Sequence, residues 1–262
     1  MGGSSMSNQS TVDKLLAMKL TRMAEAYIAQ NDDAHLCAAT FDERLSIIVD
    51  EEYIRRVNNR HTRLLKKAHL EQPHAYLANI DYTQGRTLNR NLIDKLSTCE
   101  YIDQSLNVFI TGPSGAGKTF FACGLGNAAC DHDFSTYFMR LPDFITDIEL
   151  AKQEGPYQYK KAFSKYVNPK LLIIDEWLLF SPNEEECGFI RELIHKRRRK
   201  SSTIFCSQYA DNEWYNQLGG DDNPLAEAIL DRIIHDAYRI DIRSMTPGKD
   251  VSMREVYGLH DD

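Results

Sequence analysis

Hydrophobic side chains in the first quarter of the chain recur at helical spacing. Between residues 11 and 31 the apolar positions lie three or four residues apart, which predicts one amphipathic helix. Thr40 followed by Glu43 has the pattern of a capping box. A second helix is therefore expected to begin there and to run to about Leu70.

From residue 107 onward, short apolar runs alternate with helical periods, a pattern typical of an α/β domain with a parallel sheet. The expected strands are 107–111, 136–140, 171–174, 203–207 and 238–242, and the expected helices are 118–130, 142–152, 157–165, 184–199 and 224–235. The predicted organisation is a tag-like, disordered start at 1–10, a small all-helical domain at 11–72, a connector at 73–106 and the α/β domain at 107–262.

Composition places the chain among globular proteins. Apolar residues make up 42%, and 13 Tyr and 11 Phe supply enough core material to exclude a chain that is disordered throughout. No apolar run is long enough to span a bilayer, so we expect no membrane partner. The six cysteines form no C-x-x-C pair, which predicts neither a zinc site nor a disulfide framework and favours the reducing cytoplasm.

The residues after the strand at 107–111 match the phosphate-loop pattern G-x-x-x-x-G-K-[ST] in its strand–loop–helix context. Lys118 is expected to reach the β- and γ-phosphates of ATP, and the Thr119 hydroxyl to bind Mg²⁺. The residues predicted to bind the nucleotide are Gly112, Pro113, Ser114, Gly115, Ala116, Gly117, Lys118, Thr119 and Phe120.

Three further elements carry candidate catalytic side chains. The apolar run at 171–174 ends in Asp175, a candidate Mg²⁺ ligand, and in Glu176, a candidate general base for the attacking water. Gln208 follows the expected strand at 203–207. It either contacts the attacking water or the γ-phosphate, or it is a polar loop residue without a catalytic role. Arg232 lies on the helix before the last strand. It is either a surface ion-pair residue or an arginine finger for a neighbouring subunit.

Basic residues gather on one helix although the net charge is −7. No acid occurs between Tyr53 and Leu70. At 100° per residue, Arg56, Arg60, Arg63 and Lys67 share a narrow arc. Such a stripe is either a solvated face or a surface for DNA phosphates. The residues predicted to contact duplex DNA are Arg55, Arg56, Arg60, Arg63 and Lys67.

Motifs spread over nearly the whole chain resemble one family. They are Leu20-x-x-Met23-Ala24, Phe41–Leu45, Asp50–Glu52 with the basic run after it, Gly112–Thr119, Leu171–Glu176, Ser202–Gln208 with Trp214, Leu230–Ile233, and Ser252-Met-Arg254. Together these residues resemble the IstB/DnaC clade of AAA+ ATPases and, within it, the IstB-type transposition helper proteins. The chain departs from that pattern at Trp177-Leu178-Leu179, where the family commonly has Gly-Tyr.

The resemblance implies an AAA+ P-loop core with five parallel strands in the order 5-1-4-3-2 and no C-terminal lid domain. It also implies a bacterial, cytoplasmic ATPase that self-assembles on DNA and works with a transposase, and it makes Arg254 a candidate nucleotide sensor. Two alternatives stay open at this point: a helicase loader of the DnaC type and a P-loop small-molecule kinase. Glu176 disfavours the kinase, because phosphoryl transfer to a metabolite needs no water-activating base.

Overall fold

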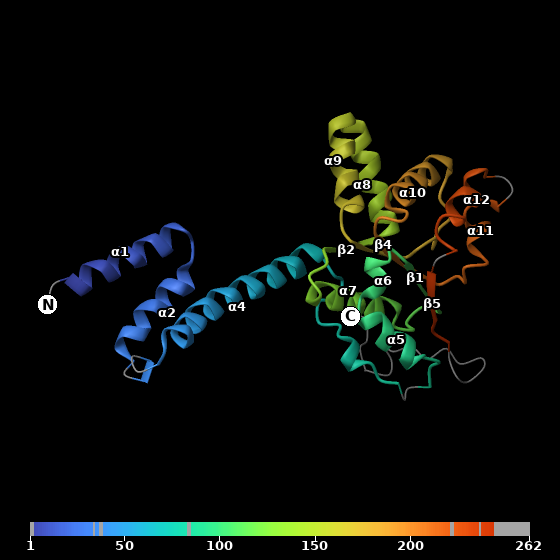
Figure 1. Cartoon of the computed structure of the whole chain (residues 1–262). Coiled ribbons are helices and arrows are strands. Elements are labelled where there is room, and N and C mark those ends of the chain that lie inside the picture. Colours follow the sequence, from blue (N-terminus) through green and yellow to red (C-terminus); the bar gives the residue numbers. More distant parts are fainter. Residues whose placement is uncertain are drawn as a thin grey trace, which may run out of the picture. The chain divides into compact units, whose positions relative to one another are not determined.

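The computed structural model in Figure 1 describes two compact units, Met1–Arg63 and Leu64–Asp262. The described residues are 3–33, 35–36, 39–82, 85–220, 223–235 and 237–243. Arg254 and the stretch in which a lid domain would follow the last strand lie outside these residues.

The described part of the first unit is helical, as the periodicity predicts. It holds α1 (Gly3–Ala17), which extends into the range expected to be disordered, α2 (Thr21–Asp32) and most of α4 (Phe41–Ala68). The prediction of a single helix over 11–31 is wrong. Lys19 has a φ of 60°, its amide donates to the Leu16 carbonyl at 2.9 Å, and the Leu20 amide donates to the Leu15 carbonyl at 2.8 Å. This is a Schellman helix end with lysine where glycine is usual.

A buried carboxylate joins the helices of the first unit. Glu52 is 4% exposed and accepts hydrogen bonds from the Arg22 amide at 3.1 Å and from the guanidinium groups of Arg55 and Arg56. Arg55 also donates to the Lys19 carbonyl at 3.2 Å. The hydrogen bond from Arg55 is the largest cause that lowers the pKa of Glu52 to about 2, so this carboxylate is charged at neutral pH. Glu52 therefore fixes the turn between α1 and α2 against α4.

The start of α4 has the predicted capping box. The Thr40 hydroxyl accepts a hydrogen bond from the Glu43 amide at 3.4 Å, and the Glu43 carboxylate accepts one from the Thr40 amide at 2.9 Å. The helix then runs for 28 residues, to within two residues of the predicted end.

The second unit is built on a parallel five-stranded sheet. Its strands are β1 (Asn107–Thr111), β2 (Thr136–Arg140), β3 (Leu171–Asp175), β4 (Ser202–Ser207) and β5 (Ala237–Asp241). Their order is β2-β3-β4-β1-β5, which is the predicted order 5-1-4-3-2 read from the other edge. Because all strands are parallel, the residues that follow their carboxyl ends meet along one edge of the sheet.

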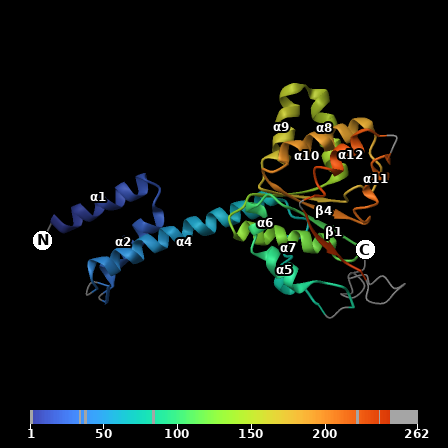
Figure 2. The same cartoon turned by 45° about the vertical axis from the view of Figure 1, so that its right-hand side comes forward.

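Helices cover both faces of the sheet (Figure 2). Alternate residues of each central strand point to opposite faces: Ile110 and Ile173 belong to one core cluster, whereas Phe109 and Leu172 belong to the other. The first cluster lies under α5 (Arg90–Ser97) and α7 (Lys118–Asp131). The second lies under α8 (Leu141–Glu154), α9 (Pro156–Val167), α10 (Glu184–Arg197), α11 (Trp214–Gln217) and α12 (Leu225–Leu230).

The stretch before β1 has more structure than the term connector suggests. It holds η1 (Leu77–Asn79), α5 and α6 (Glu100–Asp103), and none of these was expected. Asn89 caps α5 by accepting a hydrogen bond from the Leu92 amide at 3.1 Å. Ile93 and Leu96 of α5 belong to the core cluster that contains β1 residues. This segment is therefore packed into the second unit.

The departure from the family pattern at Trp177 and Leu178 lies inside the core. Trp177 is 1% exposed, Leu178 is fully buried, and the Trp177 ring meets the Phe205 ring edge-on at 4.7 Å. These residues thus support the sheet beneath the candidate site. Within the described ranges, no helix has the combination of length and apolar character that crossing a bilayer requires.

Candidate functional site

The predicted phosphate loop connects β1 to α7. Gly112 has a φ of 151°, and a Cβ at this position would lie 2.4 Å from the Ile242 carbonyl oxygen, so the close approach of this backbone requires glycine. Gly117 has a φ of 94° and begins α7 without a side-chain cap. The first amides of α7 therefore remain free of side-chain acceptors, which suits them to an anionic ligand.

Lys118 folds back over this loop. Its ammonium group donates to the carbonyls of Gly112 and Pro113, both at 2.8 Å, and its side chain is largely buried. Burial lowers the pKa of Lys118. These two backbone carbonyls thus hold the Lys118 ammonium group at the phosphate loop. A bound phosphate group would form an ion pair with it there.

Thr119 and Asp175 meet across two elements of the sheet. The Thr119 hydroxyl at the start of α7 donates to an Asp175 carboxylate oxygen at 2.7 Å, and Asp175 ends β3 with 8% exposure. Mg²⁺ prefers oxygen ligands, and in nucleotide sites it is commonly held by one or two protein oxygens together with oxygens of the bound phosphates. The Thr119 hydroxyl and the Asp175 carboxylate lie close enough to serve as two such protein ligands. The donor set therefore fits the predicted metal ion. Among the described residues no cluster of three or more His, Cys, Asp or Glu offers an alternative metal site.

A cavity of about 490 Å³ lies beside the phosphate loop and brings most of the predicted residues together, although Gly112, Pro113 and Ala116 do not line it. Lys118, Glu176 and Gln208 line it, and so do Ser114, Gly115, Gly117, Thr119, Phe120 and Asp175. Glu176 follows Asp175 directly, with a φ of 54° and with its amide bonded to an Asp175 carboxylate oxygen at 2.9 Å. The cavity therefore brings the Glu176 carboxylate to the same site as the phosphate loop.

Some residues at this cavity were not expected from the sequence. Arg140, the last residue of β2, donates to Glu71 at 2.7 Å and lies 3.9 Å from a Glu176 carboxylate oxygen. Arg86, which is 7% exposed, donates to the Ala116 carbonyl at 2.9 Å behind the phosphate loop. The position of Arg140 at the end of a predicted strand could have indicated that it lies near the site. Its carboxylate partners could not be predicted, because they depend on the register of the sheet.

Comparison with known proteins matches this site and fold to one family. The family model described as IstB-like ATP binding protein matches residues 13–252. The chain belongs to the IstB-like ATP-binding proteins. It is 36% identical to the insertion sequence ATP-binding protein y4pL of Sinorhizobium fredii over 236 residues, which cover 88% of this chain and 93% of that protein. It is 34% identical to the IS1162 ATP-binding protein of Pseudomonas fluorescens over 203 residues, covering 78% and 87%.

Solved structures share the architecture of this IstB-like protein. The crystal structure of DnaI matches 70% of the chain and 90% of its own length with a TM-score of 0.54, at 15% identity. This likeness concerns the fold alone. Membership of an ATP-binding family supports nucleotide binding, and the cavity at the phosphate loop is where the phosphate-loop residues of this chain would meet a nucleotide.

Arg232 does not line the nucleotide cavity of the IstB-like chain. The helix expected over 224–235 is shorter, because α12 ends at Leu230, so the prediction that Arg232 lies on this helix is wrong. The next residues form a turn in which the Arg232 amide donates to the Ile229 carbonyl at 3.2 Å. The turn places Ile233 in the core, where its side chain is 2% exposed. Burial of this side chain stabilises the turn more than helix propensity favours another turn of helix.

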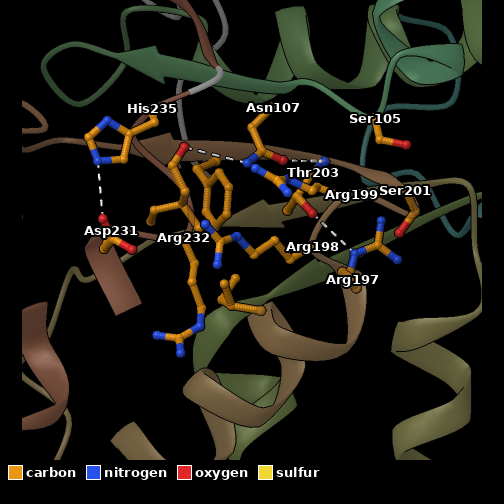
Figure 3. Close-up of a pocket in the computed structure, with 13 residues that line it drawn as sticks. Ser105, Asn107, Arg197, Arg198, Arg199, Ser201, Thr203, Asp231, Arg232 and His235 are labelled. Atoms are coloured by element: carbon orange, nitrogen blue, oxygen red, sulfur yellow. Dashed lines mark hydrogen bonds and ion pairs between the residues drawn. The ribbon is translucent and has the colours of Figure 1, made fainter. Parts of the chain in front are cut away.

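Arg232 instead lines a second, smaller pocket of about 40 Å³. This pocket lies at the amino ends of β1 and β4, marked by Asn107 and Thr203, whereas the phosphate loop follows the carboxyl end of β1 (Figure 3). Arg197 in its wall is 2% exposed and donates to the carbonyls of Tyr166, Val167, Pro169 and Ser202, and burial lowers its pKa to about 9. Arg197 is therefore structural, and Arg232 lies at the opposite ends of the strands from the nucleotide cavity and does not line it.

The predicted DNA-contacting residues all lie on α4. Arg56, Arg60, Arg63 and Lys67 are exposed, and Arg55 is partly buried. Glu52, which precedes the acid-free stretch, binds both Arg55 and Arg56. Two of the five bases thus also hold the helical unit together, which the charge pattern alone did not reveal.

Proposed function

We propose that this IstB-like protein hydrolyses ATP with Mg²⁺, assembles as a homo-oligomer on duplex DNA and assists a transposase. The observation that carries the proposal is the hydrogen bond between Thr119 and Asp175, with Glu176 beside them in the same cavity. The Thr119–Asp175 pair is what a P-loop protein needs to bind Mg²⁺ with its nucleotide, and the Glu176 carboxylate beside it is the group that hydrolysis by water requires in addition.

Each residue of the site has a distinct part in this chemistry. Lys118 exchanges its two carbonyl contacts for the β- and γ-phosphates of ATP. Glu176 orients the attacking water and accepts its proton, while Gln208 from the end of β4 hydrogen-bonds to the same water or to the γ-phosphate. Bound Mg²⁺, held through Thr119 and Asp175, would neutralise charge on the phosphate oxygens.

DNA binding is proposed for the exposed stripe on α4. Arg60, Arg63 and Lys67 are exposed on this helix, and Arg56 shares Glu52 with Arg55. Guanidinium and ammonium groups on one helix face bind backbone phosphates with little sequence preference. The binding would therefore serve assembly along DNA rather than recognition of one sequence.

The names of the relatives favour transposition over helicase loading. Two of them, at 36% and 34% identity, are insertion sequence ATP-binding proteins. An ATPase that assembles on DNA and is encoded in such an element has a transposase as its natural partner. We therefore propose the transposase as partner in preference to a replicative helicase.

Removal of two stripe residues is expected to weaken DNA binding and its dependence on salt. Each phosphate contact contributes a slope of about −0.9 to a log–log plot of affinity against salt, so Arg60→Ala/Arg63→Ala should flatten the slope by roughly two units per subunit. The measurement is a salt titration of binding to unrelated duplex sequences with a non-hydrolysable ATP analogue. The loss should be similar on every sequence.

The matched control is Arg198→Ala/Arg199→Ala, which removes two exposed arginines outside α4. This control should keep the wild-type slope. If the α4 variant keeps both its affinity and its slope while the control loses them, the DNA surface is the segment after α10, and α4 is only a solvated face.

A further inference from the structure

The small pocket at the amino ends of β1 and β4 carries an excess of positive charge. Four arginines line it, namely Arg197, Arg198, Arg199 and Arg232. Among the described residues in its lining, Asp231 is the one acid, and its carboxylate lies 3.1 Å from the His235 ring. Guanidinium groups gathered around one small space repel one another, so an anion between them would stabilise the arrangement.

Arg197 contributes a charge that no carboxylate neutralises within the described part of the chain. Its side chain is 2% exposed and donates to the Thr203 hydroxyl at 3.1 Å and to backbone carbonyls, among them those of Tyr166 and Pro169. Buried charges are usually paired with an opposite charge. Because these contacts already use most of its N–H groups, Arg197 would attract a ligand by its charge rather than by a hydrogen bond.

Arg198 and Arg199 bring two more guanidinium groups to the pocket. Both side chains are exposed, and neither forms an ion pair or a side-chain hydrogen bond with any other described residue. They lie in the turn that ends α10, at the pocket between Arg232 and Ser201 (Figure 3). Arg198 has φ −49° and ψ 126° and Arg199 has φ 57°, values typical of a type II turn, in which glycine is usual at the second position. An arginine at that position therefore indicates a role for its side chain.

Two donors in the pocket wall are buried without a hydrogen-bond partner among the described residues. They are the Ser201 hydroxyl, in a residue that is 7% exposed, and Nε of Arg232. Asn107 in the same wall already donates to the Ile233 carbonyl at 3.4 Å and accepts from the Thr203 amide at 3.1 Å. A buried donor without a partner is costly, so these groups indicate an acceptor that binds in the pocket.

The size of the pocket limits what this acceptor can be. A volume of about 40 Å³ corresponds to about three water molecules or to one small oxyanion. The nucleotide cavity is about 490 Å³, so this pocket is too small for a nucleotide. A phosphate in a DNA backbone carries a sugar on each side, and these sugars would not fit between the arginines. Water alone would satisfy the buried donors but would not balance the charge.

We propose that this pocket is a binding site for a free tetrahedral oxyanion, with inorganic phosphate as its ligand. The Ser201 hydroxyl and Nε of Arg232 donate to the phosphate oxygens from the pocket wall, and Arg198 and Arg199 donate from the turn. The site is separate from the phosphate loop and from the stripe on α4. The inference therefore does not depend on the proposed ATPase activity or on DNA binding.

The test is a calorimetric titration of the full chain with inorganic phosphate at constant ionic strength. All proteins carry Lys118→Ala, which disables the phosphate loop as a competing phosphate site. The Lys118→Ala protein should bind a single phosphate, and adding Ser201→Ala or Arg199→Gly should weaken this binding about tenfold or more, the usual effect of losing a hydrogen bond to a charged group. The matched control Lys200→Ala removes an exposed base of the same segment that does not line the pocket, and it should keep the affinity.

Thermal stability separates loss of the site from damage to the fold. Ser201→Ala removes an unpaired buried hydroxyl, and Arg199→Gly removes a positive φ from a non-glycine residue, so neither should lower Tm in the absence of phosphate. Phosphate should raise the Tm of the Lys118→Ala protein and of the Lys200→Ala control, because it binds the folded state. It should raise the Tm far less in the two pocket variants.

A second ligand tests the chemistry of the site. Glycerol 3-phosphate, whose phosphate carries an organic substituent, should bind more weakly than inorganic phosphate, because the substituent does not fit the pocket. Equal or tighter binding of glycerol 3-phosphate would contradict a site for a free oxyanion.

Three further results would overturn the proposal. Unchanged affinity in Ser201→Ala and Arg199→Gly would mean an adventitious ion only. An equal loss in Lys200→Ala would reduce the binding to a general attraction by a basic surface. A fall in duplex affinity in Arg198→Ala/Arg199→Ala would make a DNA phosphate the ligand of the pocket.

Discussion

The Glu176→Gln protein is expected to bind ATP with wild-type affinity and to hydrolyse it about a hundredfold to ten-thousandfold more slowly, the usual contribution of a general base. Glutamine keeps the size of the side chain and can still orient a water, but it cannot accept the proton. Glu176 lies at the cavity beside the Thr119–Asp175 pair, whereas Lys118 is the group that we propose to bind phosphate.

The measurement pairs nucleotide affinity with single-turnover phosphate release. Glu154→Gln, at the end of α8, removes an exposed carboxylate away from the cavity and should behave like the wild type. A Glu176→Gln protein that releases phosphate at the wild-type rate would show that water is activated by another group.

The second large effect is expected at Arg232. Because it lies at the amino ends of the strands, away from its own phosphate loop, its side chain can reach a γ-phosphate only in a neighbouring subunit. Arginine fingers typically contribute about a thousandfold or more to kcat, so Arg232→Ala should lose hydrolysis on that scale and keep ATP binding. Lys118→Ala should be inactive because it binds no ATP.

Mixing the two inactive proteins should restore turnover. In a head-to-tail assembly, roughly a quarter of the interfaces would join an intact ATP site of an Arg232→Ala subunit to the intact arginine of a Lys118→Ala subunit. Arg191→Ala, which removes an exposed arginine of α10, serves as the control and should be active alone. If Arg232→Ala hydrolyses ATP normally, Arg232 is not a trans-acting residue.

The sheet was predictable because its strands are short segments rich in apolar and aromatic residues that alternate with segments of helical period. β1 and β2 begin and end at the predicted residues, and the other three strands differ by one residue at one or both ends. The strand order came from the family resemblance and not from the pattern. The phosphate loop and the Asp175–Glu176 pair followed from their fixed spacing to these strands.

The features that the sequence did not predict depend on the backbone conformation at single residues or on contacts between elements that are far apart in the chain. The break at Lys19 has no glycine to mark it, and α5 is eight residues long with only Ile93 and Leu96 buried. Arg140 needed the register of β2 against β3, which places it opposite Asp175. The double role of Arg55 and Arg56 needed the fold of the helical unit around Glu52.

We propose that ATP controls assembly of this protein on duplex DNA. The most direct test is sedimentation of the full chain with duplexes of increasing length, with a non-hydrolysable ATP analogue, with ADP, or without nucleotide. We expect complexes that grow with duplex length in the presence of the analogue, and that are lost with ADP and in Lys118→Ala. Complexes of equal size without nucleotide, or a protein that stays a monomer on DNA with the analogue, would contradict the claim.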